Sequence, residues 1–70
     1  MPIIRVDLME GRTPEMKENL IAALCEAAVN ALDVKPEQVR VILNEMPKAH
    51  YSIAGKSVAR REREAGQKES

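Results

Sequence analysis

A proline and two arginines are the residues of this 70-residue chain whose types could do chemistry. Pro2 follows Met1, so removal of Met1 would turn its nitrogen into a secondary amine able to take up a proton. Reference α-amino groups titrate at about 7.7–8.0, near the pKa that suits a general base. Arg12 and Arg40 could bind an anionic substrate around that amine. The residue types therefore predict proton transfer on a substrate that carries a carboxylate.

A structural role for the same residues is the alternative. Proline is tolerated at the first position of a strand, where no ladder donor is needed. Arg12 could form surface ion pairs with Glu10 or Glu15, and Arg40 could pair with an acid such as Glu45. Function is favoured because a helix N-terminus gives an arginine no gain from its dipole, and because an unpaired charge in an apolar strand is costly.

A strand–helix–strand unit must position these residues. Alternating apolar and charged residues predict a strand over residues 3–9. Thr13 as N-cap predicts a helix over about residues 14–32. A second strand is predicted from Val39 to Met46, with apolar residues on both faces. This order predicts an α/β fold, a small βαβ unit with parallel strands and a right-handed crossover.

The remainder of the chain is predicted to add little to the core. The stretch from His50 to Ala54, followed by Gly55, predicts a short strand or hairpin. Charged residues dominate afterwards, which divides the chain into a domain at 1–60 and a disordered tail at 61–70. Because one helix covers only one face of a two-stranded sheet, the other face needs a partner, and the folded unit is expected to be an oligomer.

Composition excludes several classes of function. The 11 basic and 11 acidic residues balance, so no strong field favours nucleic acid or an anionic membrane. The single Cys25 excludes an intrachain disulfide and a cysteine-rich metal site. No stretch predicts a signal peptide or a membrane span, so we expect a cytoplasmic protein. No metal or organic cofactor is expected, because the base and the electrophile are terminal or side-chain groups.

Four stretches in this order and spacing carry a family resemblance: PIIRVDLMEGRT, EMKENLIAALCEAA, VRVILNEM and HYSIAG. From Pro2 to about Arg60 the chain resembles the 4-oxalocrotonate tautomerase family, the 2-hydroxymuconate tautomerases. The resemblance implies that Pro2 is the general base and that Arg12 binds the substrate carboxylate distant from the keto group. It also implies that Arg40 of a neighbouring subunit polarises the 2-keto oxygen. The implied assembly is a homohexamer, three dimers whose sheets join.

The resemblance implies three further substrate contacts. Tyr51 stands where the family usually has phenylalanine and would, with Ile53, form an apolar wall that keeps the pKa of the base low. Met9 would place its backbone amide near the substrate. His50 is expected to have no catalytic role, since no carboxylate or nucleophile is arranged around it. Cys25, on the helix among apolar neighbours, is expected to be a small buried hydrophobic residue and not a nucleophile.

The predicted function is a cofactor-independent keto–enol tautomerase acting on unsaturated 2-oxo or 2-hydroxy acids such as 2-hydroxymuconate. One alternative is a related hydratase or dehalogenase of short unsaturated acids, although the segment Tyr51-Ser52-Ile53 offers no acid to activate water. Another is a non-catalytic oligomerisation module, if Met1 is retained. A small DNA-binding dimer is disfavoured by the neutral charge.

Overall fold

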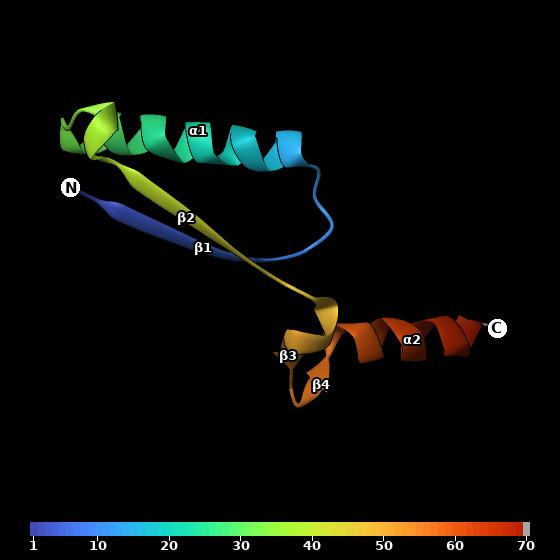
Figure 1. Cartoon of the computed structure of the whole chain (residues 1–70). Coiled ribbons are helices and arrows are strands. Elements are labelled where there is room, and N and C mark those ends of the chain that lie inside the picture. The colour runs from blue at the N-terminus through green and yellow to red at the C-terminus, as the bar shows by residue number, and fades with distance from the viewer. Residues whose placement is uncertain (70) are drawn as a thin grey trace.

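The computed structural model describes the backbone of residues 1–69 and the side chains of residues 1–66. A βαβ unit occupies one end of an elongated molecule, and a small hairpin followed by a helix occupies the other (Figure 1). The elements in chain order are β1 (Ile3–Met9), α1 (Pro14–Leu32), the 3-10 turn η1 (Pro36–Gln38), β2 (Arg40–Met46), the 3-10 turn η2 (Lys48–His50), β3 (Ser52–Ile53), β4 (Lys56–Ser57) and α2 (Val58–Glu69).

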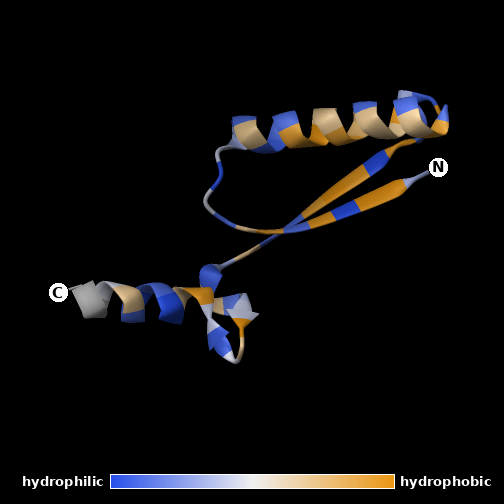
Figure 2. Cartoon of the chain, turned by 180° about the vertical axis from the view of Figure 1, so that it is seen from behind, coloured by the Kyte–Doolittle hydropathy of each residue, from blue (hydrophilic) through white to orange (hydrophobic). Residues whose placement is uncertain are grey.

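The βαβ unit confirms the predicted fold class. β1 and β2 pair in parallel, with Ile3 opposite Arg40 at one end and Met9 opposite Met46 at the other. Helix α1 lies along one face of this pair, and Figure 2 shows its apolar side turned toward the strands. The side chains on that face of β1 are half-buried, and those on the opposite face are largely exposed.

Local chemistry sets both ends of α1. The hydroxyl of Thr13 accepts a hydrogen bond from the backbone N–H of Met16 at 3.1 Å, which confirms the predicted N-cap. At the other end Asp33 adopts a left-handed conformation with φ of 55°, and its N–H donates to the carbonyl of Val29 at 3.0 Å. The helix therefore runs over the predicted residues.

The predicted hairpin is also present. β3 and β4 are antiparallel, with Ser52 opposite Ser57 and Ile53 opposite Lys56. Ala54 and Gly55 form a two-residue loop in which both φ angles are positive, 55° and 82°. This geometry matches the twist of the flanking strands and belongs to the favoured class of hairpin turns.

Helix α2 corrects the expectation of a disordered tail over residues 61–70. The helix continues to Glu69, and Ser70 lies outside the described residues. The charges that predicted disorder are spaced so that they pair: Arg60 binds Glu64 one turn later at 3.4 Å. Two lysines outside the helix reach it as well, Lys56 to Glu64 and Lys48 to Glu62, each at 3.0 Å.

A single copy has almost no closed core. Among residues 1–66, Ala28 is the one buried residue, at 9% exposure. The radius of gyration is 16.7 Å, whereas a compact 70-residue domain has about 11 Å. The accessible surface is 5484 Å², against about 4400 Å² expected for a compact protein of this mass. The excess is of the order that one partner buries in a stable interface, which supports a homo-oligomer.

The uncovered surface includes one face of the sheet. Ile3 is 53% exposed and Ile42 is 39% exposed, both on the face opposite α1. Within residues 1–69, neither helix is both long enough and apolar enough to cross a membrane.

Candidate active site

Pro2 lies directly before β1, at the first rung of the ladder. Its carbonyl accepts a hydrogen bond from the backbone N–H of Arg40 at 3.0 Å, and its ring is half-buried. Because the residue stands outside the strand, its nitrogen has no part in the ladder. Met1, which precedes Pro2, is 74% exposed. While Met1 is attached, the nitrogen is an amide without basicity.

Arg40 begins β2 on the face opposite α1, in register with Ile3. Its guanidinium donates to the carbonyl of Glu37 at 2.6 Å. The alternative pairing of Arg40 with Glu45 is wrong, because Glu45 is on the other face of the strand and binds Lys17 of α1 at 2.9 Å. The guanidinium therefore keeps donors available for an anion.

Arg12 lies in the bend between β1 and α1 and is exposed. One of its terminal nitrogens donates to the carbonyl of Met9 at 3.0 Å. Among residues 1–66 no carboxylate forms an ion pair with Arg12, so the surface pairs with Glu10 and Glu15 are absent there. The backbone carbonyl of Met9 thus binds the Arg12 guanidinium, and this hydrogen bond holds the guanidinium at the end of β1.

The structure does not bring all the predicted site residues together in one chain. Pro2 and Arg40 lie at the start of the parallel pair, and Met9 and Arg12 lie at its end. Seven residues of extended strand separate the two ends by about 23 Å. A site that uses both Pro2 and Arg12 must therefore take them from different copies.

The hairpin carries the remaining predicted contacts. Tyr51 is 41% exposed and Ile53 is 49% exposed, both beyond the end of β2. The carbonyl of Tyr51 accepts from the N–H of Val58 at 2.7 Å, and that of Ile53 accepts from the Arg61 guanidinium at 3.5 Å. The backbone of the hairpin is thereby tied to α2, while two apolar side chains remain open to a partner. His50 is exposed in η2, and Cys25 is half-buried on α1.

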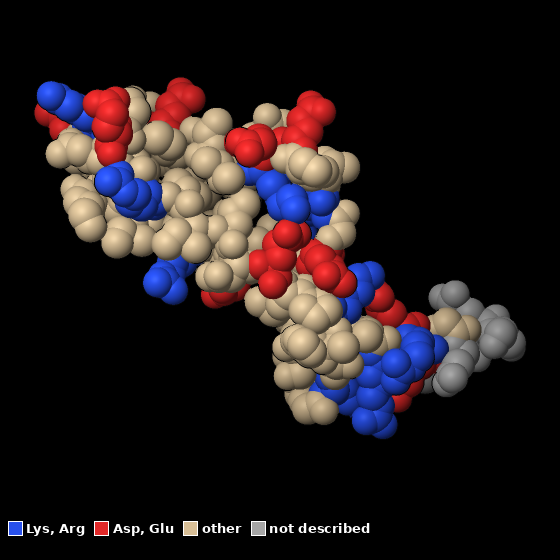
Figure 3. All heavy atoms as spheres, in the orientation of Figure 1, with Lys and Arg blue, Asp and Glu red and all other residues tan. Residues whose placement is uncertain are grey.

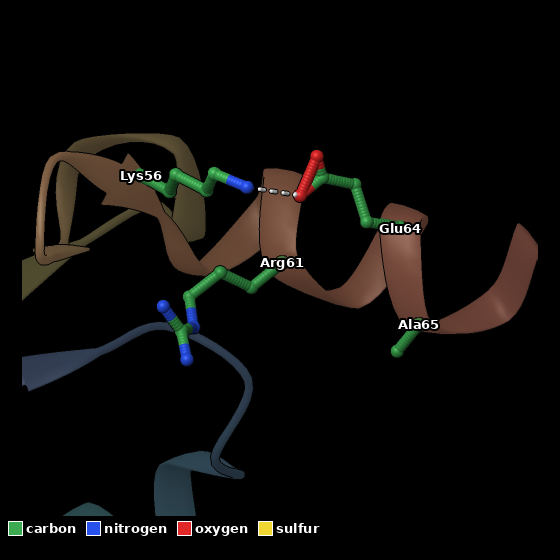
Figure 4. A pocket seen from close by; sticks show the side chains of 4 residues that line it. All are labelled: Lys56, Arg61, Glu64 and Ala65. Carbon is green, nitrogen blue, oxygen red and sulfur yellow. Dashed lines mark hydrogen bonds and ion pairs between the residues drawn. The ribbon is translucent and has the colours of Figure 1, made fainter. Parts of the chain in front are cut away.

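A hollow of about 390 Å³ lies against α2 and contains none of the predicted site residues. Figure 4 shows its lining, which consists of Lys56, Arg61, Glu64 and Ala65. The hydrogen bond from Lys56 and the nearby Arg60 hold the pKa of the Glu64 carboxyl below its ordinary value. Lys and Arg gather over this end of the molecule in Figure 3, but Glu64 already binds the Lys56 ammonium. We interpret the hollow as a structural junction.

No group of three or more histidine, cysteine, aspartate or glutamate side chains in the described part of the chain is arranged to hold a metal ion.

Sequence reasoning missed the bond between Lys17 and Glu45, which anchors α1 to β2. The signal was available, because Glu45 shares its side of β2 with Val41 and Leu43, the residues that α1 covers.

Comparisons with known proteins identify the family of this chain. A family model described as tautomerase enzyme matches residues 2–61. The 2-hydroxymuconate tautomerase of Pseudomonas sp. strain CF600 is 47% identical over 60 residues, which cover 86% of this chain and 95% of that protein.

Solved structures give the same result. A structure from work on the 4-oxalocrotonate tautomerase isozymes of Methylibium petroleiphilum has a TM-score of 0.86 at 49% identity, covering 90% of this chain and 98% of that one. A heterohexamer 4-oxalocrotonate tautomerase from Chloroflexus aurantiacus J-10-fl has a TM-score of 0.80 at 41% identity, covering 84% and 95% of the respective chains. The chain therefore belongs to the tautomerase family and is an isomerase of the 4-oxalocrotonate tautomerase type.

Proposed function

We propose that this chain is a cofactor-independent tautomerase of unsaturated 2-oxo and 2-hydroxy acids, such as 2-hydroxymuconate, with Pro2 as its general base. The position of Pro2 is the observation that supports this proposal most. The residue is held through its carbonyl directly before β1, and its nitrogen has no part in the hydrogen bonds of the sheet. Removal of the exposed Met1 gives a secondary amine at a fixed place.

The reaction needs only proton transfer. The Pro2 amine takes the proton from the 2-hydroxyl of the dienol, which leaves a dienolate and a protonated amine. The same amine then returns the proton to a carbon of the conjugated chain, and the oxygen becomes a ketone. No electrons are exchanged with a second molecule, so neither a metal nor a redox cofactor is required.

The arginines supply the charge that this sequence of steps needs. Arg40 donates to the oxygen on which negative charge develops and to the adjacent carboxylate, a type of interaction that stabilises the transition state more than the substrate. Arg12 binds the distant carboxylate, for which the forked guanidinium is better suited than an ammonium. Both cations also disfavour protonation of Pro2 and so lower the pKa of its amine.

The site is completed by other copies of the chain. Because about 23 Å separate the two ends of β1, a site that uses both Pro2 and Arg12 would take them from different subunits. Dimers with joined sheets, three of which form a homohexamer, would bring such ends together and cover the uncovered sheet face. In this assembly Tyr51, Ile53 and Met9 line the substrate site, with Tyr51 and Ile53 providing its apolar wall.

Subunit complementation tests both the base and the shared site. Pro2→Ala chains and Arg12→Ala chains are each expected to be strongly impaired with 2-hydroxymuconate. When the two are unfolded, mixed and refolded together, mixed assemblies contain sites with both wild-type residues and should regain activity. Each variant refolded alone is the control, and native mass spectrometry verifies mixing. Well-mixed oligomers without recovered activity would show that the two residues do not act across subunits.

A chelator experiment tests the claim of cofactor independence. The processed enzyme should keep its full rate of ketonisation after dialysis against a chelator. Loss of activity that an added metal ion restores would contradict the proposed mechanism.

A further inference from the structure

The outer edge of β1 is open. At the two ends of the ladder, the N–H of Arg40 donates to Pro2 and the N–H of Glu10 donates to Met46. Backbone groups of a strand alternate between its two edges, so the even-numbered residues of β1 direct their N–H and C=O groups toward β2. Ile3, Arg5, Asp7 and Met9 therefore direct their N–H and C=O groups to the other edge, where residues 1–69 provide no strand.

Two opposite charges stand in the middle of this edge strand. Arg5 and Asp7 lie on the sheet face opposite α1, in register with Ile42 and Asn44 of β2. Both are exposed, and neither forms an ion pair within residues 1–66. The rest of this face of β1 is apolar, Ile3 at one end and Met9 at the other. A partner that covers the face must satisfy both charges, because burying an unpaired charge is costly.

A second copy satisfies them in one register. When two β1 strands pair antiparallel about a twofold axis, open-edge residues oppose open-edge residues. A register centred on Arg5 places two arginines opposite each other, and one centred on Asp7 places two aspartates opposite each other. A register centred on Val6 places Arg5 opposite the partner's Asp7 twice, by symmetry. Like charges directly opposite are destabilising and opposite charges are stabilising, so this third register is selected.

We propose that Arg5 pairs with the partner's Asp7 across joined β1 strands, and that this pair sets the register of the dimer. The inference rests on the joined-sheet dimer proposed above. In this register Ile3 lies opposite the partner's Met9, so apolar residues flank the charged pair on both sides.

The register also determines the distance between the two parts of the active site. With Val6 at the axis, Pro2 lies opposite the partner's Glu10. The partner's Arg12 then lies two residues further on, about 7 Å along the strand, within reach of an arginine side chain. A slip to a neighbouring register moves Pro2 and the partner's Arg12 further apart or closer together by about 7 Å. Arg5 and Asp7 are therefore positioning residues for a site that they do not touch.

Charge reversal tests the pair. Arg5→Asp and Asp7→Arg each place like charges opposite each other twice in the dimer, so each variant alone should assemble at least about tenfold more weakly at low ionic strength. The double variant Arg5→Asp/Asp7→Arg restores two opposite pairs and should assemble and react like the wild type. Glu18→Arg on the exposed surface of α1 makes the same change in net charge as Asp7→Arg and should stay assembled.

Mixing distinguishes a pair between chains from a pair within one chain. Arg5→Asp chains refolded with Asp7→Arg chains should form mixed dimers and regain activity, because every opposed position then carries opposite charges. Assembly of the single variants as strong as that of the wild type would overturn the pair. Rescue by the double variant without rescue by mixing would also overturn it, because the pairing would then lie within one chain. A wild-type chain that is monomeric at all concentrations would instead refute the joined-sheet dimer itself.

Discussion

The backbone N–H of Arg40 donates to the carbonyl of Pro2 at 3.0 Å, while the Arg40 side chain lies on the uncovered face of the sheet. Arg40 shares the uncovered face with Ile3, and Pro2 precedes Ile3 by one residue. The guanidinium of the same chain binds Glu37 instead. This geometry supports the proposal that the Arg40 acting on a given Pro2 belongs to another subunit.

The two arginines are expected to affect different kinetic constants. Arg12→Ala should raise KM for 2-hydroxymuconate strongly and change kcat less, because the distant carboxylate is bound alike in substrate and transition state. Arg40→Ala should lower kcat by ~10²-fold, the usual scale for removing a donor to a developing oxyanion. Steady-state kinetics measure both effects. Arg12→Lys and a monoacid substrate are the controls; similar small effects of both alanine variants would contradict the assigned roles.

Activity should follow the removal of Met1. Only chains that have lost Met1 carry a basic Pro2 nitrogen, so specific activity should rise in proportion to the fraction of chains that lack Met1 in the intact mass spectrum. Treatment with a methionine aminopeptidase should activate a sample that retains it. Full activity in a sample whose chains all retain Met1 would exclude Pro2 as the base.

The pH profile of the processed enzyme provides a separate test. Because the free amine is the active form, kcat/KM should rise with pH. The midpoint of this rise should lie below the ordinary α-amino range of about 7.7–8.0. The arginines cause this displacement by disfavouring the protonated amine. In Arg12→Ala the midpoint should move to higher pH, which pH-dependent kinetics can resolve. A midpoint that stays in place would mean that Arg12 does not act on the amine.

Patterns within a few residues predicted most of the fold. The cap at Thr13, the strand alternation and the loop at Gly55 all act locally, and the structure confirms each. The second strand begins one residue later than predicted, because the N–H of Val39 closes η1 on the carbonyl of Pro36. Composition did not predict helix α2, because composition ignores the spacing of charges; Lys48 and Lys56, which bind its glutamates, also lie before residue 61.

The candidate site was less accessible to prediction from a single sequence. Strand parity places Arg40 on the uncovered face, and the strand length alone separates Pro2 from Arg12. What surrounds Pro2 depends on surfaces that other copies contribute, and no periodicity within one chain encodes their arrangement. The roles of Pro2, Arg12 and Arg40 therefore stay predictions, although membership of the family is shown.

The hairpin loop contains a residue with a strained backbone, and a substitution should relieve the strain. Ala54 has φ of 55°, a conformation that costs a residue with a Cβ roughly 1–2 kcal/mol. Ala54→Gly should therefore stabilise the protein by up to about 1 kcal/mol, after the larger entropy loss of glycine is deducted. Thermal unfolding at fixed protein concentration measures this change. Ala22→Gly within α1 is the matched control and should destabilise by about 1 kcal/mol; a similar loss for Ala54→Gly would show that the loop carries no strain.

The junction between the hairpin and α2 should weaken in acid. Since the pKa of Glu64 is lowered in the folded chain, its stabilising contribution is complete above the ordinary value of 4.5 and is lost as the pH falls through the lowered value. Carbon-13 NMR of the Glu64 carboxyl measures the titration. Lys56→Met should raise the pKa of Glu64 more than Arg60→Met does, because the hydrogen bond from Lys56 is the larger cause. Equal shifts in the two variants would contradict this ranking.

That Ala28 is the one buried residue among residues 1–66 has a consequence for the cell as well as for the test tube. When folding and association are one event, the melting temperature depends on protein concentration by mass action. Dilution alone should unfold the protein, and the level of its synthesis then decides how much enzyme exists. Free energies of unfolding for variants of this chain have meaning only at a stated concentration.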